Sequence, residues 1–366
     1  MRVLAGAWLA FASVLTLGLA AEVWLRYGRL QDARASERFR ATNVFFANAT
    51  ELNAGTHSLW AERWKEYQPG AKVDVVVGGE RFVVEMNSQG YRTHEFAVPK
   101  PVGVVRVICI GGSTTVAGRT NDETYPALLE AKLARRFPGL RVEVLNFGVS
   151  SVTSDYWYAR LDRVLGYEPD ILVQYDAIND ISWRHFPRFA AAHRLRGWAY
   201  RSLLLERLFP FPVEALDPYL RDSFVTLGDT ARACAARRVS YLGATFAAPD
   251  PQRARGDFRR HLEHNSEYWT RRFPLHSYAT WAAIVRRYNG LFVQFAERYH
   301  VPYVLAHEPL EDPGLFIDVC HFTPEGIERL ADVLLPAVAD LVEATPAGRD
   351  WRPQVGPAPA GVDPSP

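Results

Sequence analysis

The sequence predicts an α/β protein with a mostly parallel sheet and helices on both faces, a three-layer α/β/α sandwich. Residues 104–110 are almost entirely apolar, which is typical of a strand buried on both faces. Further strand-like runs then alternate with segments whose apolar residues have helical spacing. This alternation indicates repeated βα units, and active sites in such sheets lie at the carboxyl ends of the strands.

The individual elements are expected in the following order. Residues 74–77 and 81–85 are rich in β-forming residues and flank Gly78-Gly79, which predicts a hairpin. After the strand at 104–110, helical spacing of apolar residues predicts a helix over 125–137 that stops at Pro138-Gly139. The remaining elements are expected as strands at 142–145, 171–175, 239–246 and 302–306, and as helices at 156–165, 281–299 and 324–335.

An N-terminal transmembrane helix is expected in addition. Residues 3–21 carry no charge, and nineteen residues at about 1.5 Å rise span roughly 29 Å, close to the ~30 Å hydrocarbon core of a bilayer. We favour a retained anchor, while the small residues Gly18-Leu19-Ala20 leave a cleaved signal peptide as the alternative.

The orientation of this helix is open to two interpretations. Five arginines between residues 26 and 40 would, by the positive-inside rule, keep the following domain in the cytoplasm. An N-terminal signal before a large domain more often exports that domain. We therefore expect the main domain in the periplasm or at the cell surface, or secreted if the segment is cleaved.

These features divide the chain into four parts. We expect a membrane anchor or signal peptide at 1–25, a linker with the small hairpin at 26–100, and the main domain at 101–342 with an insertion around 181–280. Residues 343–366 are rich in Pro, Ala and Gly without apolar periodicity, which predicts a disordered tail.

Composition excludes several classes of protein. With 48% hydrophobic and 23% charged residues and a net charge of +1, the 366-residue chain is neither disordered, nor collagen-like, nor a highly basic nucleic-acid binder. Three cysteines without a CxxC pair argue against a disulfide scaffold and a thiolate zinc site, and we expect no metal and no cofactor. Residues 181–300 nevertheless contain 19 Arg, no Lys and 10 acidic residues, a local charge of +9. This charge is either a set of solvated helix faces or a field that attracts an anionic surface or substrate.

Four polar segments are expected to meet at the carboxyl edge of the sheet. Three follow the first three strands of the βα region, and the fourth precedes a helix start with Thr323 as N-cap and Pro324 at the first position. The segments are Gly111-Gly112-Ser113, Asn146-Phe147-Gly148, Ala177-Ile178-Asn179-Asp180 and Asp318-Val319-Cys320-His321.

Each residue type in these segments fits one task in acyl transfer. Ser113 is the candidate nucleophile, which requires a base such as His321 to remove its proton. Asp318, three residues before His321, can reach its Nδ1 and fix its tautomer. The candidate oxyanion hole consists of the backbone N–H groups of Ser113 and Gly148 and the side-chain amide of Asn179.

With these segments the sequence resembles the SGNH (GDSL-type) hydrolases, in particular their membrane-anchored bacterial type. The resemblance covers residues 104–335, with all four blocks in order: Ser113, Gly148, Asn179 and the Asp318/His321 pair. It implies a flavodoxin-like fold and a serine esterase that forms an acyl-enzyme on Ser113. Two positions depart from the family pattern, because Gly112 replaces the usual aspartate before the serine and Ala177 replaces the glycine that opens GxND.

Several alternatives remain at this stage. The substrate is expected to be an acetyl or other short-chain ester of a carbohydrate or lipid. The alternatives are an O-acyltransferase that modifies a cell-envelope polysaccharide and a non-catalytic glycan-binding module. Nucleotide binding is disfavoured because residues 111–118 lack the lysine of a P-loop.

Two further segments allow both a structural and a functional interpretation. Residues 198–209 form an apolar stripe that is expected to pack in the core, or alternatively to act as a lid beside the membrane with its arginines facing anionic lipid or polymer. The residues His261, Glu263, His264 and Glu267 are expected to form a solvated helix surface rather than a metal site.

Overall fold

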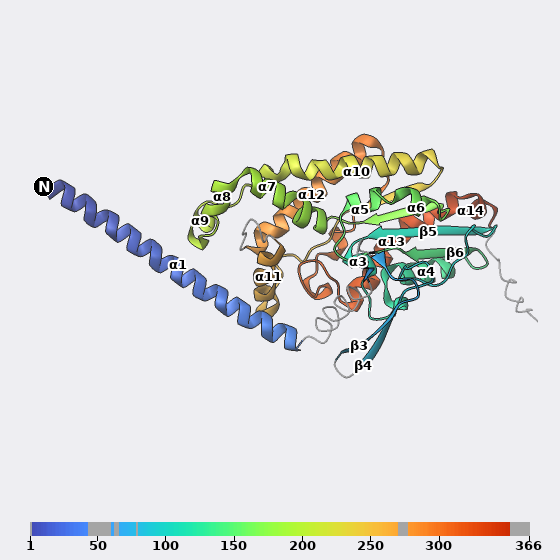
Figure 1. The fold of residues 1–366 in the computed structure, drawn as a ribbon, viewed down its shortest axis with the longest axis horizontal. Helices are drawn as coiled ribbons and strands as arrows, with labels where there is room; N and C mark the ends of the chain where they lie inside the picture. The colour runs from blue at the N-terminus through green and yellow to red at the C-terminus, as the bar shows by residue number, and fades with distance from the viewer. Residues whose placement is uncertain (1, 43–59, 62–65, 78–79, 270–276, 352–366) are drawn as a thin grey trace, which may run out of the picture.

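The structure is a computed structural model that describes residues 2–42, 60–61, 66–77, 80–269 and 277–351 (Figure 1). Its centre is a five-stranded sheet in which every neighbouring pair is parallel. The strands are β5 (Val104–Gly111), β6 (Arg141–Asn146), β7 (Ile171–Tyr175), β8 (Ser240–Ala244) and β9 (Tyr303–Val304). Their order, β6-β5-β7-β8-β9, is the flavodoxin-like order 2-1-3-4-5, so the predicted α/β fold is confirmed.

Helices cover both faces of this sheet. On one face α4 (Tyr125–Arg136) packs against α13 (Pro324–Ala344). On the other face α10 (Asp217–Ala236) contacts both α5 (Ser154–Tyr158) and α12 (Tyr278–Tyr299). All eight residues of β5 are buried between these two layers, as its apolar sequence predicts.

The connections contain short helices. Near the carboxyl ends of the strands these are α3 (Ser113–Val116), η1 (Asn121–Glu123) and the π-helical turn η2 (Asp180–His185), while α6 (Leu161–Leu165) leads into the start of β7. The insertion after β7 adds α7 (Phe186–Ala192), α8 (Arg194–Ala199), α9 (Leu203–Leu208) and η3 (Val213–Leu216), and α11 (Gly256–Trp269) follows β8. The turns η4 (Glu308–Leu310) and η5 (Pro313–Leu315) precede α13, and α14 (Pro346–Asp350) follows it.

Two small antiparallel pairs precede the main sheet. They are β1 (Trp60–Ala61) with β2 (Glu66–Tyr67), and β3 (Lys72–Val77) with β4 (Glu80–Glu85). The second pair is the hairpin expected from the sequence, although Gly78-Gly79 themselves lie outside the described residues.

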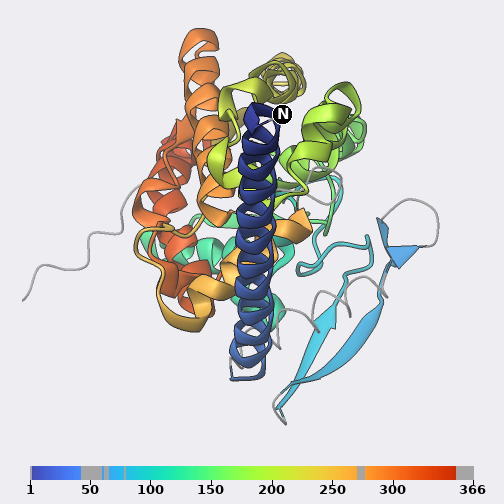
Figure 2. The ribbon, with the colours of Figure 1, turned by 90° about the vertical axis from the view of Figure 1, so that its left-hand side faces the viewer.

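The N-terminal helix α1 (Arg2–Thr42) is longer than expected. It projects from the domain at its N-terminal end and runs along α11 and α9 further on (Figures 1 and 2). Among the described residues it is the one helix long and apolar enough to cross a membrane, which fits an anchor or a signal sequence. The expectation of a linker from residue 26 is wrong up to Thr42, because the helix continues without a break.

Other boundaries also differ from the expected ones; for example, the strand expected at 302–306 is reduced to Tyr303–Val304. The helix expected at 156–165 is divided into α5 and α6, and the helix expected to end at 335 continues to Ala344. The disordered tail is wrong for residues 343–351, because α14 follows and the Trp351 indole N–H donates to the carbonyl of Pro138 at 3.0 Å. The remainder of the expected tail lies outside the described residues.

Candidate active site

Ser113 occupies the first position of α3, directly after the carboxyl end of β5. A Cβ on Gly111 would lie 2.3 Å from Oγ1 of Thr115 and 2.4 Å from the carbonyl oxygen of Tyr175, so only glycine fits there. This close approach lets the chain turn immediately after the strand and places the serine at the edge of the sheet. The side chain lies within the protein, because Ser113 is only 8% exposed.

The turn 318–321 brings a histidine and a carboxylate to this serine. The hydroxyl of Ser113 donates to Nε2 of His321 at 2.8 Å, and Nδ1 of His321 donates to Oδ2 of Asp318 at 2.7 Å. The proton is assigned to Nδ1 because the carboxylate can only accept a hydrogen bond. Asp318, His321 and Ser113 therefore form one unbroken hydrogen-bonded chain.

Backbone contacts fix the geometry of this turn. Oδ1 of Asp318 accepts the N–H groups of Cys320 at 2.9 Å and His321 at 2.7 Å, so the carboxylate folds the turn back onto itself. The N–H of Ile317 donates to the carbonyl of His321 at 2.9 Å. Thr323 then caps α13 by accepting the N–H of Gly326, as its sequence predicts. Three residues of separation are therefore enough to orient the imidazole.

The charges of the pair stabilise each other. Burial alone would raise the pKa of Asp318, but the attraction of His321 and the N–H donors around the carboxylate lower that pKa to about 2. Burial likewise disfavours a protonated His321, yet the charge and hydrogen bond of Asp318 outweigh it and raise the pKa of His321. Asp318 is consequently ionised at neutral pH, and His321 is a stronger base than a free imidazole.

The three expected oxyanion donors lie in different local settings. The N–H of Ser113 is at the start of a helix, where backbone donors have no partner within the helix. The amide nitrogen of Asn179 has two hydrogens, and it donates to the carbonyl of Val152 at 2.8 Å. The N–H of Gly148 donates to Oδ1 of Asn146 at 2.9 Å, so it must share or exchange that bond to bind an oxyanion.

The glycine at position 112 has a steric explanation. A Cβ there would lie 2.8 Å from Nδ2 of Asn179 and 3.8 Å from Oδ1 of Asp176. Asp176 is 8% exposed, and its Oδ2 has no hydrogen-bond partner among the residues described. Burial and the charge of Asp180 raise the pKa of Asp176 well above its ordinary value. A carboxyl group therefore lies beside position 112, supplied from the end of β7 and missed by the sequence analysis.

Other supporting residues were also missed. Arg92 is buried and donates to the carbonyls of Val116 at 2.6 Å and Gly118 at 2.9 Å, which holds the chain just after α3. Asp180 accepts the N–H of Ser154 at 3.0 Å and so fixes the start of α5. Arg92 carries no sequence signal, because its partners are distant backbone groups, whereas Asp180 belongs to the expected segment 177–180 but had been given no role.

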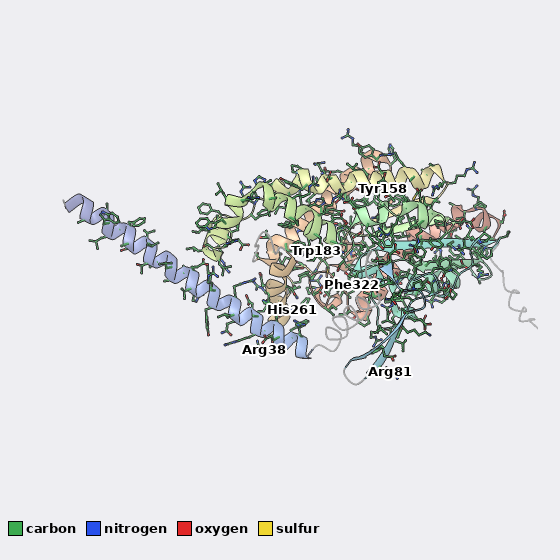
Figure 3. All side chains as sticks on the ribbon, viewed as in Figure 1. Arg38, Arg81, Tyr158, Trp183, His261 and Phe322 are labelled. Carbon is green, nitrogen blue, oxygen red and sulfur yellow. The ribbon has the colours of Figure 1, made fainter. Side chains whose placement is uncertain are left out.

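His261 is not part of a solvated helix surface, contrary to expectation. It is completely buried where α11 meets α1 (Figure 3), and its Nδ1 lies 2.7 Å from Oγ of Ser36. Its ring also lies beside the backbone of Ile317, next to Asp318. Burial lowers the pKa of His261 to about 4, so it is neutral at pH 7. The N-terminal helix and the catalytic turn thus contact the same histidine.

A model of the GDSL-like lipase/acylhydrolase family matches residues 109–329, well over half of the chain. No curated protein matches the chain. Similar solved structures include an α/β hydrolase from the Lake Arreo metagenome (23% identity, 65% of this chain and 96% of that chain covered, TM-score 0.42). A second is a GDSL-like lipase from Bacteroides thetaiotaomicron (15% identity, 66% of this chain and 89% of that chain covered, TM-score 0.39). A third is a catalytic mutant of an acetylxylan esterase from Geobacillus stearothermophilus (19% identity, 64% of this chain and 94% of that chain covered, TM-score 0.41). The family match includes both Ser113 and His321.

Proposed function

The chain belongs to the GDSL-like lipase/acylhydrolase family, and from this membership and the site geometry we propose that it is a serine esterase with Ser113 as nucleophile. The observation that carries the proposal is the hydrogen-bonded chain from Asp318 through His321 to Ser113, with distances of 2.7 and 2.8 Å. Such an arrangement activates a hydroxyl that is otherwise a poor nucleophile.

In the first half of the proposed reaction, Oγ of Ser113 attacks the carbonyl carbon of the ester and Nε2 of His321 takes its proton. Asp318 stabilises the imidazolium that forms, because it is already ionised and lies 2.7 Å from Nδ1. The carbonyl oxygen becomes an oxyanion, which the N–H of Ser113, the N–H of Gly148 and the amide of Asn179 bind. His321 then protonates the alkoxide leaving group as the C–O bond breaks, which leaves an acyl group on Ser113.

In the second half, a water molecule attacks the acyl-enzyme and His321 again accepts the proton. Collapse of the second tetrahedral intermediate returns the proton to Oγ of Ser113 and releases the carboxylic acid. In each half of the reaction one proton is transferred, and His321 both accepts it and returns it, so the proposed reaction needs no cofactor.

The substrate is proposed to be an acetyl or other short acyl ester of a carbohydrate or lipid. The indole N–H of Trp183 donates to Oδ1 of Asn179 at 3.1 Å, and this side chain is 37% exposed. A flat apolar ring with its polar edge held in place, directly beside an oxyanion donor, suits contact with a sugar ring or a small acyl group.

The catalytic domain is proposed to lie outside the cytoplasm, held by α1 as a retained anchor. What supports retention is that α1 runs unbroken past Ala20 to Thr42, and that its second half is docked through Ser36 on His261. Protease added to spheroplasts, from which the outer barrier has been removed, should degrade the domain, and protection of the domain there would contradict this orientation.

A fluorophosphonate probe tests the nucleophile. The protein should be labelled, Ser113→Ala should not be labelled, and the control Ser88→Ala, at an exposed serine outside the site, should react like the parent. Equal labelling of Ser113→Ala would remove the serine from the mechanism.

A series of 4-nitrophenyl esters of increasing chain length tests the substrate class. The proposal expects the highest kcat/KM for acetyl or another short chain, and a maximum at long chains would contradict it. The same assay with a sugar acceptor separates hydrolysis from acyl transfer. Retained glycan binding without turnover of any ester would indicate a binding module instead.

A further inference from the structure

The insertion contacts α1, through α9, at the point where the uncharged segment of α1 ends. Glu22 is the first charged residue after the uncharged run 3–21. Its carboxylate accepts the hydroxyl of Ser202 at 2.9 Å and the N–H of Leu204 at 3.0 Å, at the start of α9. One turn later, Arg26 donates to the carbonyl of Arg201 at 3.1 Å. If α1 crosses a bilayer, as proposed above, α9 begins at the surface of that bilayer.

The helices α8 and α9 expose large apolar side chains at this level. Leu195 and Trp198 on α8 are 87% and 71% exposed, and Leu208 and Phe209 at the end of α9 are 61% and 66% exposed. The expectation that the stripe 198–209 packs in the core is therefore wrong for Trp198, Leu208 and Phe209. Four large apolar groups close together on two neighbouring helices are unfavourable in water and typical of a surface that contacts an apolar phase.

The same two helices carry positive charge. Their arginines are all exposed, while the one acidic residue between 193 and 210, Glu206, is buried. The exposed arginines are Arg194, Arg196, Arg201 and Arg207. Guanidinium groups interspersed with exposed Leu, Trp and Phe match the headgroup region of a bilayer that contains anionic lipid.

We infer that α8 and α9 form a second membrane contact, in which the exposed apolar side chains enter the headgroup region of the bilayer that α1 spans and the arginines bind anionic lipid. An anionic bilayer is favoured over a second copy of the chain or a soluble acidic polymer because the patch is continuous with α1. On α1 itself Trp24 and Tyr27, 70% and 59% exposed, lie just beyond Glu22, where aromatic residues mark the membrane interface.

Two attachments fix the height of the active site. Ser36, which contacts His261 beside the catalytic turn, follows Glu22 by about four helical turns, or roughly 21 Å along α1. A helix alone can tilt, but a helix and a lateral contact together cannot tilt freely. The catalytic turn is thus held up to about 21 Å above the headgroups, which suits an ester carried on a chain that extends from the membrane.

The contact can be tested with a fluorescent label on Leu208→Cys in the full chain reconstituted into vesicles. The three native cysteines, Cys109, Cys234 and Cys320, are buried, so a maleimide bearing the environment-sensitive dye NBD reacts selectively with the new thiol. The matched control is Val102→Cys, which is fully exposed in the loop before β5. The strand β5 lies toward the opposite end of the domain from α8 and α9 (Figure 1). Vesicles contain phosphatidylcholine with or without phosphatidylglycerol, and lipids carrying a quencher near the headgroup report proximity.

The expected result is a loss of NBD fluorescence at position 208, larger with phosphatidylglycerol, and no loss at position 102. A variant with Arg194, Arg196, Arg201 and Arg207 all changed to Gln should lose the dependence on phosphatidylglycerol, while its circular dichroism stays unchanged. Equal and negligible quenching at positions 208 and 102 would overturn the proposal. Quenching at position 208 that is the same with and without phosphatidylglycerol, and the same in the arginine variant, would also overturn it. A dye at 208 that is shielded from water but not quenched by lipid would indicate a second copy of the chain and also overturn it.

Discussion

The substitution Asp318→Asn isolates the orienting role of the carboxylate. Asparagine retains Oδ1, which accepts the N–H groups of Cys320 and His321, so the turn should keep its shape. The new NH₂ group, however, faces Nδ1 of His321, where the carboxylate accepts a hydrogen bond at 2.7 Å. Two donors cannot bond to each other, so the imidazole proton moves to Nε2. A protonated Nε2 cannot accept the proton of Ser113.

The expected magnitude follows from that change of tautomer. The equivalent substitution in a serine-protease triad leaves the geometry intact and lowers kcat about 10⁴-fold, which corresponds to roughly 5 kcal/mol of barrier. The control Asp162→Asn removes the same charge from an aspartate whose side chain is 93% exposed, and it should leave kcat unchanged.

The pH dependence of kcat/KM provides a second measurement on the same pair. His321 must be neutral to act as a base, so activity rises with pH as this group loses its proton. Because Asp318 raises the pKa of His321, the acid limb of the parent should have its midpoint above 6.5. In Asp318→Asn only the effect of burial remains, and the midpoint should move to lower pH. Activity within tenfold of the parent, with an unmoved midpoint, would refute the orienting role.

Three further substitutions test the oxyanion donors and the core. Asn179→Ala should lower kcat by about 10²–10³-fold with little change in KM, and an unchanged kcat would exclude this amide as a donor. Gly112→Ala should also lower kcat, because the new Cβ would lie 2.8 Å from Nδ2 of Asn179. The control Gly290→Ala should leave kcat unchanged, because a Cβ there has no atom within 4 Å. In urea unfolding, Leu133→Ala, a completely buried residue of α4, should lose about 2–5 kcal/mol of stability. Val225→Ala, at a residue 62% exposed, should lose little, and equal losses would contradict the assigned core.

The sheet and the Asp318–His321–Ser113 chain could be predicted because their physical signals are local. A central parallel strand is buried on both faces, so β5 has a nearly continuous apolar sequence. Ser113 follows that strand after two glycines, and a separation of three residues is enough for Asp318 to reach His321. In each case neighbouring residues determine the geometry, and the sequence displays them.

The predictions that were wrong or incomplete concern features that depend on contacts between residues distant in sequence. Proline usually ends a helix, yet α13 continues through Pro336 because Leu334, Val338 and Val342 are completely buried. Their burial outweighs a cost of about 3 kcal/mol for an interior proline. The carboxyl group of Asp176 beside Gly112 belongs to another strand, so the motif pattern around Ser113 contained no sign of it.

The docking of α1 was hidden for a different reason. Its buried positions are the small residues Ala35 and Ser36, and the polar contacts around them come from arginine side chains, such as Arg29 donating to the carbonyl of Glu263 at 2.8 Å. A helix that docks through small residues and backbone carbonyls shows no apolar periodicity, so residues 26–42 resembled a charged linker.

This packing makes the N-terminal helix part of the support of the proposed catalytic turn, in addition to its proposed role as an anchor. His261 is buried and neutral, with Ser36 of α1 on one side and the backbone of Ile317 on the other. Ile317 in turn donates to the carbonyl of His321, the residue that bonds to Ser113. Contacts thus run from α1 through His261 of α11 to the backbone of the turn 317–321, and because interiors are close-packed, a shift of α1 must be accommodated at that turn. We therefore propose that the same helix both positions the domain relative to the bilayer and supports His321, the proposed general base.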